Sequence, residues 1–465
     1  MNKTKKEKKM TLGRAIFVFV FVVVALLTVT IGLDGPAHIA MFLSAIVAGI
    51  VAVCSGYSWD ELQEGIGETI KAAVPAILIL LAIGVIMGVW LCGGIVPTMI
   101  YYGLEILSPS IFLLASCLIC AVIATATGSS WSTVGTIGVA LMGIGAGLGV
   151  APGMTAGAII SGAYFGDKMS PLSDTTNLAP AMAGTDIFTH IRHMIFTTGP
   201  SFLITLVIFG VLGIRFVNRD FDASIVKMYT STLSDTFMIS PIMLIPPILV
   251  IAMVVKKVPA LPGLIAVAFL GAIFALIFQG ASMQEIISSA FSGFSIETGV
   301  AEVDKLLNRG GMTSMMEIIC LILISLSFAG IVEKSGMVTI VIETALKNVK
   351  KDSTVITTTL LATIFTNFAT GVQYVALIIP GRMFKDIYKE RGLHPKNLSR
   401  ALEDTGTLCA PFVPWGTDAA FLSGVLGVTV GIYAPFCFLN YINPIVSLIC
   451  AQTGWTIEKI DKEKE

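Results

Sequence analysis

Long apolar segments separated by short polar ones fill the chain from residue 12 onward. Each segment approaches the length of about 20 residues with which an α-helix crosses the hydrocarbon core of a bilayer. We therefore predict membrane-spanning helices near residues 12–33, 37–56, 72–93, 110–127, 133–150, 155–174, 195–217, 240–256, 261–280, 314–332, 353–381, 401–424 and 431–450.

Two kinds of segment modify this simple pattern. Residues 58–71, 95–107 and 335–351 are polar and amphipathic, which predicts helices lying at the membrane interface. Residues 110–150 are open to two interpretations, because two spans and a re-entrant hairpin both return the chain to the same side.

Composition agrees with a protein embedded in lipid. Of the 465 residues, 55% are hydrophobic and only 13% are charged, whereas a soluble domain carries roughly 25% charged residues. The net charge of −1, with no basic tract beyond the first ten residues, argues against a nucleic-acid partner. The apolar run at 12–33 is too long for a signal peptide, so we expect the basic N-terminus to stay in the cytoplasm.

Two pairs of distant segments indicate an internal repeat. Residues 94–110 resemble residues 336–353 at an offset of about 242, and residues 161–174 resemble residues 405–418 at an offset of about 244. Two matches at nearly one offset are hard to obtain by chance. The predicted organisation is a basic cytoplasmic N-terminus (1–11), a first repeat (12–217), an external connecting loop (218–239), a second repeat (240–450) and a cytoplasmic tail (451–465).

Loop charges predict how the two halves face. Basic residues gather in cytoplasmic loops of membrane proteins, and here they occur at 3–9, 192–193, 256–257 and 382–400, whereas 218–238 and 281–313 lean acidic. The first half therefore starts inside and the second outside. The predicted fold class is an all-α polytopic membrane protein, an inverted-repeat secondary transporter with discontinuous helices or re-entrant hairpins, with its site near the midplane.

Glycine and polar residues interrupt the apolar pattern at matching places of the two halves. Residues 124–136 correspond to 366–373, and residues 162–177 correspond to 403–418. Non-helical backbone at membrane depth is tolerated only where it lines a protein-enclosed cavity, and a charge there costs at least ~2.5 kcal/mol. We expect these four segments to form an ion or substrate site.

The polar side chains of these segments are the candidate ligands. Hard cations such as Na⁺ prefer oxygen ligands, and an exchanging proton needs a carboxylate. The candidates are Thr127, Ser129, Ser130, Thr133, Asp167, Asp174, Thr175, Asn177, Asn367, Gln373, Asp404, Thr405, Thr417 and Asp418. Of these, Asp167, Asp174 and Asp418 are expected to hold Na⁺.

The acidic candidates also have structural interpretations that the sequence leaves open. Asp174 and Asp418 could cap the helices that follow them. Asp167 could form an ion pair with Lys168 at a membrane interface.

Two other groups of polar residues are equally open to a structural role. Glu403 and Asp404 could be a charge pair near the cytoplasmic surface. Thr127, Ser129 and Ser130 could bond back to carbonyl groups of their own helix.

The sequence predicts neither an enzyme nor a bound cofactor. Cys117 and Cys120 form a C-x-x-C, but no second pair or histidine cluster accompanies them, so small buried side chains are the better interpretation. No nucleophile–base pair or metal set is visible. Na⁺ and H⁺ enter only as transported ions.

Two motifs resemble those of the bacterial NhaC-type Na⁺/H⁺ antiporters. They are Thr127-Gly-Ser-Ser-Trp-Ser-Thr-Val-Gly-Thr136 and Ser161-Gly-Ala-Tyr-Phe-Gly-Asp-Lys-Met-Ser-Pro-Leu-Ser-Asp-Thr-Thr-Asn-Leu-Ala179, and the likeness continues through residues 183–194. The resemblance implies a multi-pass inner-membrane carrier that exchanges Na⁺ for H⁺, with a branch that exchanges malate and lactate. It also implies a possible homodimer.

Three functions remain in competition. In the leading hypothesis, Na⁺ and H⁺ compete for the same carboxylates of an alternating-access antiporter. In the second, the cargo is a small organic anion or an amino acid, held by Lys168 or Arg192. The third, a passive channel, is disfavoured by the predicted inverted repeat.

Overall fold

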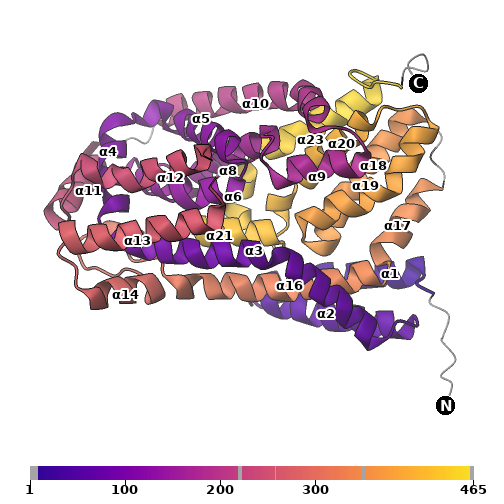
Figure 1. Cartoon of the computed structure of the whole chain (residues 1–465), viewed down its shortest axis with the longest axis horizontal. Coiled ribbons are helices and arrows are strands. Elements are labelled where there is room, and N and C mark those ends of the chain that lie inside the picture. The colour runs from indigo at the N-terminus through magenta and orange to yellow at the C-terminus, as the bar shows by residue number, and fades with distance from the viewer. Residues whose placement is uncertain (1–8, 218–222, 257, 348, 350, 461–465) are drawn as a thin grey trace.

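The computed structural model describes residues 9–217, 223–256, 258–347, 349 and 351–460. In these residues the chain is built from helices, and the strand-like pairing is an isolated bridge between Leu393 and Lys459. The predicted all-α class is therefore confirmed (Figure 1). The predictions for 1–8, 218–222, 257 and 461–465 lie outside the described residues.

The first half of the chain folds into a series of long and short helices, of which η1 and η2 are π-helical. They are α1 (Leu12–Leu26), η1 (Leu27–Gly32), α2 (Ala37–Cys54), α3 (Trp59–Cys92), α4 (Ile95–Ile106), α5 (Pro109–Thr127), α6 (Ser130–Thr133), η2 (Val134–Gly138), α7 (Val139–Gly147), α8 (Pro152–Met169), α9 (Asp174–Ala183) and α10 (Ile187–Val217).

The second half repeats this alternation, with short 3-10 turns labelled η. Its elements are α11 (Ala223–Thr236), η3 (Pro241–Leu244), α12 (Ile245–Val255), α13 (Ala260–Phe278), α14 (Met283–Ser292), α15 (Ala301–Leu307), η4 (Met312–Met315), α16 (Met316–Lys334), α17 (Met337–Leu346), α18 (Asp352–Thr370), α19 (Gln373–Glu390), α20 (Pro395–Gly406), η5 (Ala410–Phe412), α21 (Thr417–Leu426), α22 (Val430–Tyr433), η6 (Ala434–Phe436) and α23 (Phe438–Thr453). Helix α11 occupies part of the predicted connecting loop.

Seven helices of the described chain are long and apolar enough to cross a membrane, and nine if each of two bent pairs counts as one span. This is fewer than the apolar pattern predicts, because several predicted spans are broken. Residues 353–381 divide at Gly371 into α18 and α19. The separate interfacial helix predicted at 58–71 is wrong, because a capping box at Ser58 starts the continuous helix α3 there.

The backbone of the two halves repeats at a nearly constant offset. Helices α4, α5 and α9 have the counterparts α17, α18 and α21, and left-handed glycines fall at matching places. These are Gly94 and Gly336 (φ 72° and 70°), Gly128 and Gly371 (66° and 69°), and Gly184 and Gly427 (86° and 72°). Residues with a side chain rarely adopt this conformation, so glycine is required at each helix end. The opposite membrane orientation of the two halves stays a prediction.

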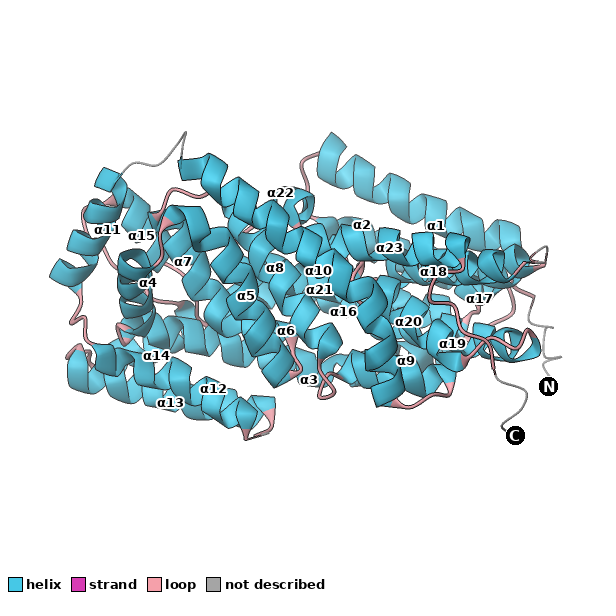
Figure 2. Cartoon of the chain, turned by 90° about the horizontal axis from the view of Figure 1, so that it is seen from above, coloured by secondary structure: helices cyan, strands magenta, loops and turns pink. Residues whose placement is uncertain are grey.

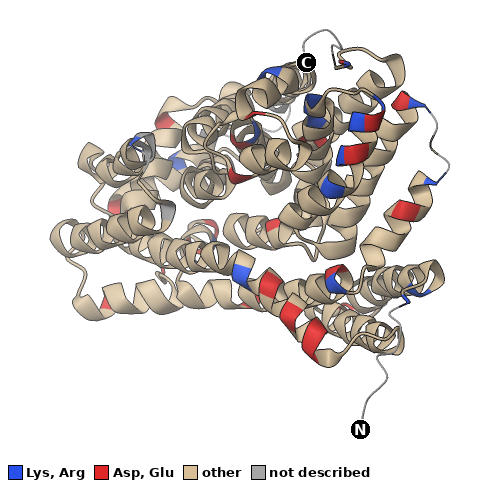
Figure 3. Cartoon of the chain, turned by 45° about the vertical axis from the view of Figure 1, so that its right-hand side comes forward, with Lys and Arg blue, Asp and Glu red and all other residues tan. Residues whose placement is uncertain are grey.

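Long helices enclose a centre of short ones. Helices α3, α10, α13 and α16 run along the long axis, while α6, α8, α9, α20 and α21 lie between them (Figures 1 and 2). The first and the last described residues lie at one end of this axis (Figures 1 and 2), and the ribbon positions of Lys, Arg, Asp and Glu are concentrated toward that end (Figure 3). The broken elements therefore meet in the interior of the bundle.

Helices α3 and α16 touch through their backbones. A Cβ on Gly65 would lie 2.7 Å from the carbonyl oxygen of Gly330, and a Cβ on Gly330 would lie 2.5 Å from that of Gly65. Thr69 Oγ1 donates a hydrogen bond of 2.9 Å to the Leu326 carbonyl across the same crossing. Small residues at such contacts let membrane helices approach closely.

Gly65→Ala should therefore destabilise the protein, because its methyl group meets backbone that cannot move aside. Overpacking of this kind costs about 1–3 kcal/mol. Gly67→Ala is the matched control, since nothing lies within 4 Å of its Cβ and alanine favours a helix over glycine by up to ~1 kcal/mol. Thermal unfolding in detergent should show a lower midpoint for Gly65→Ala alone. Equal midpoints would contradict the backbone contact.

Candidate ion-binding site

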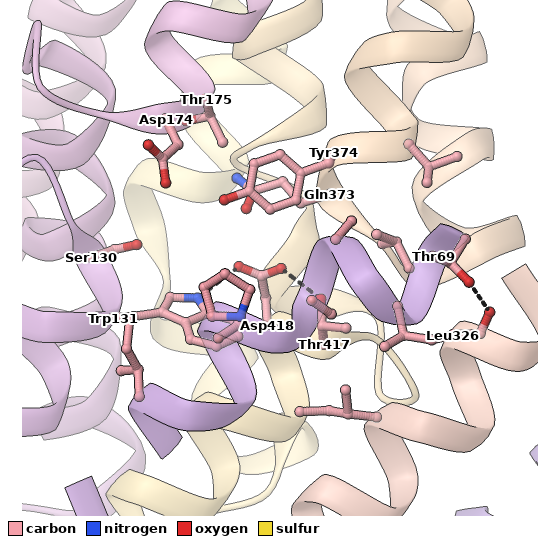
Figure 4. Close-up of a pocket in the computed structure, with 18 of the residues that line it drawn as sticks. Thr69, Ser130, Trp131, Asp174, Thr175, Leu326, Gln373, Tyr374, Thr417 and Asp418 are labelled. Atoms are coloured by element: carbon pink, nitrogen blue, oxygen red, sulfur yellow. Dashed lines mark hydrogen bonds between the residues drawn. The ribbon is translucent and has the colours of Figure 1, made fainter. Parts of the chain in front are cut away.

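A cavity of about 410 Å³ lies where the broken helices meet. Figure 4 shows Asp174 and Thr175 above it, Trp131 and Asp418 below it, and Gln373 and Tyr374 reaching in from the side. The walls come from α3, α16 and the four interrupted segments. Their polar or aromatic members are Glu68, Thr69, Ser129, Ser130, Trp131, Asp167, Ser173, Asp174, Thr175, Glu333, Gln373, Tyr374, Thr417 and Asp418.

The break between α5 and α6 is built by local hydrogen bonds. Gly128 ends α5, and its amide donates to the Ala124 carbonyl at 2.8 Å. The Ser129 amide donates to Thr127 Oγ1 at 3.1 Å, and Ser129 Oγ then caps α6 by accepting from the Ser132 amide at 3.1 Å. Serine is a preferred N-cap because its side chain satisfies an amide that the helix leaves free.

The second half has a similar break between α18 and α19. The Gly371 amide donates to the Asn367 carbonyl at 2.7 Å, and the Val372 amide donates to Thr370 Oγ1 at 3.3 Å. The Gly371 carbonyl accepts from the Thr417 amide at 2.9 Å, which ties this break to the start of α21. Both halves therefore interrupt a helix in the same way, with a left-handed glycine and a threonine hydroxyl that accepts from the backbone amide two residues further on.

Asp167 is held by the first break. Its Oδ2 accepts hydrogen bonds from the Ser130 amide at 3.1 Å and from Ser130 Oγ at 2.6 Å. The amide is free because Ser130 opens a helix, where the first N–H groups have no intrahelical partner. The Asp167–Lys168 ion pair considered from the sequence is wrong, since Lys168 pairs with Asp404 instead.

Asp418 is held by donors from both halves of the chain. Its Oδ1 accepts from Trp131 Nε1 at 3.2 Å and from Tyr164 Oη at 2.8 Å, while Thr417 Oγ1 lies 3.3 Å from Oδ2. The Trp131 ring stacks on Phe421 of α21 with the centroids 4.2 Å apart. These contacts fix the carboxylate against the wall of the cavity.

Capping does not explain the two aspartates that open α9 and α21. Ser173 is the N-cap of α9 and accepts from the Thr176 amide at 3.4 Å, which leaves Asp174 in the first turn with its side chain exposed. Gly416 is the N-cap of α21. An acidic residue in a first turn gains from the positive end of the helix dipole, but both carboxylates also line the cavity.

The charge of the cavity wall is entirely negative. Five carboxylates line it, and among the described residues that form the wall there is no lysine or arginine. Glu68 and Glu333 join the three predicted aspartates. Clefts lined by one sign of charge concentrate the opposite ion, so this cavity favours a cation.

Asp404 lies in a separate buried cluster, so its predicted place among the cavity ligands is wrong. It forms an ion pair with Lys168, and neither side chain is exposed. Its Oδ1 also accepts from Thr197 Oγ1 at 3.1 Å and from Asn443 Nδ2 at 2.8 Å. Asp404 and Glu403 are fully buried within α20, which also excludes the proposed charge pair at the surface.

Other predicted ligands bond to nearby backbone and do not line the cavity. Asn177 is exposed and donates to the Pro171 and Ser173 carbonyls. Asn367 Nδ2 donates to the Gly406 carbonyl at 2.5 Å, and Thr405 Oγ1 donates to that of Ala401 at 2.8 Å. Thr127 and Thr133 stabilise the first break through Ser129.

Several cavity residues were missed by the sequence analysis. Trp131 lies inside the first motif and Tyr374 follows Gln373, so position alone could have indicated them. Tyr164 lies inside the second motif, behind the cavity wall, but its contact with Asp418 could not be predicted because the two residues are far apart along the chain. Glu68 and Thr69 were not predicted to line the cavity, because residues 58–71 were assigned to a helix at the membrane interface.

The fold and the cavity together define a class: a multi-pass membrane carrier whose broken helices meet around an acidic cavity. The family model described as "Na+/H+ antiporter family" matches residues 162–455. The chain belongs to this family.

Curated relatives match almost the whole chain. A malate-2H⁺/Na⁺-lactate antiporter of Bacillus subtilis is 39% identical, covering 96% of this chain and 95% of the relative. The Na⁺/H⁺ antiporter NhaC of Alkalihalophilus pseudofirmus is 37% identical, covering 97% and 98%. The arginine/ornithine antiporter ArcD of Halobacterium salinarum is 35% identical, covering 98% and 95%.

The buried Lys168–Asp404 pair gives a prediction about stability. Lys168→Met should destabilise the protein by about 3–5 kcal/mol, because it leaves a buried carboxylate without its counter-ion. The double variant Lys168→Met/Asp404→Asn removes both charges and should recover part of the loss. Thermal unfolding in detergent measures both. If the double variant loses as much stability as Lys168→Met and Asp404→Asn lose together when measured separately, the two residues are not coupled.

Proposed function

We propose that the protein exchanges Na⁺ for H⁺ across the bacterial cytoplasmic membrane by alternating access, with its N-terminus in the cytoplasm. The one observation that carries the proposal is the acidic cavity at the helix breaks, with five carboxylates and no basic side chain in its described wall. The family membership and the similarity to NhaC antiporters support it. In this proposal the protein is a carrier and not an enzyme.

Asp167 and Asp418 are prepared to bind a cation. Each accepts hydrogen bonds from donors in the surrounding structure, which fix the position of the carboxylate. Oxygen atoms that still face the cavity can then bind Na⁺, together with the hydroxyl groups of Ser130 and Thr417.

Exchange follows from the cost of an empty acidic site. A carboxylate that is sealed from water without a counter-ion is expensive. The carrier therefore reorients readily only when the carboxylates hold Na⁺ or when the negative charge is reduced by a proton. Leakage without exchange is suppressed by the same cost.

An organic anion as the main cargo finds less support in the cavity. Lys168 is fully buried in its pair with Asp404, and Arg192 is exposed outside the cavity wall. Neither is available to bind a carboxylate there. An anion such as malate would need bound Na⁺ to offset five negative groups.

A cationic amino acid is the second candidate cargo. The cavity, of about 410 Å³, is much larger than one bare ion requires, and its wall contains Trp131 and Tyr374 beside the carboxylates. Aromatic faces attract organic cations. The similarity to an arginine/ornithine antiporter agrees with this possibility.

Asp418→Asn and Asp174→Asn should each abolish Na⁺-dependent pH changes in everted membrane vesicles, because each removes a negative charge from the cation site. Asp60→Asn is the control, since Asp60 is exposed in the first turn of α3 and does not line the cavity. It should exchange at the wild-type rate. Unchanged exchange by the well-folded Asp418→Asn variant would remove this carboxylate from the mechanism.

The cargo itself is tested with purified protein in liposomes. Wild-type protein should dissipate an imposed pH difference when Na⁺ is added, and labelled malate or arginine should not accumulate by counterflow. Counterflow of labelled arginine without any effect of Na⁺ on pH would replace Na⁺/H⁺ exchange by the second candidate.

A further inference from the structure

Glu403 lies directly behind the wall of the cavity. Its side chain is fully buried in α20. One oxygen, Oε1, accepts hydrogen bonds from Thr175 Oγ1 at 3.1 Å and from Thr407 Oγ1 at 2.8 Å. Thr175 also lines the cavity, so a single side chain separates Glu403 from the space that the cation would occupy.

The second oxygen of Glu403, Oε2, has no hydrogen-bond partner in the part of the chain that the structure describes. A buried polar atom without a partner is unusual and calls for an explanation. The ionised form would leave a charged oxygen without a hydrogen bond from the chain in the protein interior. In the form protonated on Oε1, the unpartnered oxygen is a neutral carbonyl oxygen, which costs less to bury.

Glu403 has charged neighbours of both signs but no counter-ion of its own, so it can gain or lose a proton. Lys168 and Asp167 face it from α8, and Arg400 lies one turn before Asp404 on the same helix as Glu403. Lys168 is committed to Asp404, whereas no ion pair to Glu403 occurs among the described residues. The nearby cation therefore moderates a charge on Glu403 without cancelling it.

We propose that Glu403 carries the exchanged proton, at a site separate from the carboxylates that hold Na⁺. This inference rests on the proposed Na⁺/H⁺ exchange and deepens it. The proton arrives from hydronium in the cavity, which transfers it to the Thr175 oxygen while the Thr175 hydroxyl proton moves to Glu403 Oε1. Release runs through the same two transfers in reverse, and water takes up the proton.

Separate sites still give exchange, because the two ions repel each other. Na⁺ beside Asp174 and Thr175 favours the ionised form of Glu403 and so expels its proton. A proton on Glu403 removes a negative charge close to the cavity and so weakens Na⁺ binding. Such coupling is reciprocal and typically changes affinity by roughly 5- to 150-fold.

The test compares Na⁺ affinity at several pH values in purified protein. In the wild type, labelled Na⁺ should bind more weakly as the pH falls. Glu403→Gln keeps the shape of the protonated acid, so its Na⁺ affinity should be lower at high pH and should lose most of its pH dependence. In liposomes this variant should lose more than tenfold of its Na⁺-driven H⁺ movement, yet retain Na⁺/Na⁺ exchange at saturating Na⁺.

Two threonine variants test the path of the proton. Thr175→Val removes the hydroxyl on the cavity side and should slow Na⁺-driven H⁺ movement about tenfold. Thr407→Val is the matched control, because it removes an equivalent donor to the same oxygen on the side away from the cavity. Both variants lose one hydrogen bond to Glu403, but only Thr175→Val interrupts the path, so Thr407→Val should move H⁺ clearly faster than Thr175→Val, and equal rates would contradict the path.

The outcomes separate this inference from the proposed function. Wild-type protein without Na⁺-driven H⁺ movement would overturn both. Normal wild-type exchange with a Glu403→Gln variant that keeps the wild-type pH dependence would place the proton on the cavity carboxylates and overturn the inference alone. A folded Glu403→Gln variant that neither binds nor exchanges Na⁺ would overturn it too, because Glu403 would then belong to the Na⁺ site.

Discussion

The hydrogen bond from the Ser130 amide to Asp167 is the contact on which the rest of the site depends. Inside a continuous helix that amide would be used by a carbonyl one turn earlier. It becomes available only because α5 ends at Gly128 and a new helix starts at Ser130. A buried carboxylate and a broken helix therefore require each other, since the carboxylate needs donors and the break leaves donors without partners.

The sequence predicted the breaks well and the contacts across them poorly. Glycines and polar residues in apolar runs indicated both interruptions, and Ser130, Asp167, Thr417 and Asp418 do line one cavity. The direction of a side chain at a break follows from packing, which the sequence does not display. Asn367 has the residue type of a ligand, yet its amide satisfies a backbone carbonyl.

Hydropathy also has a physical limit as a guide to the helices of this protein. It averages over many residues, so a single left-handed glycine such as Gly371 leaves a run that is still apolar throughout. A hydropathy average also assigns the polar end of a helix and the apolar rest of the same helix to different segments. In α3 the polar end carries Glu64 and Glu68, which are exposed and lie 2.9 Å and 3.7 Å from Lys334 Nζ of α16, so this polar end is solvated and also contacts a neighbouring helix.

The acidic groups of the interior divide into fixed and exchangeable ones. Asp404 has a counter-ion that is part of the chain, so its charge is balanced in every state that keeps Lys168 beside it. Asp167, Asp174, Asp418 and Glu403 form no ion pair with another described residue, so their charge must be balanced by ions from solution. A carrier needs both kinds: the fixed pair supplies a constant field, whereas the unpaired groups make the cost of crossing the membrane depend on the ions that are bound.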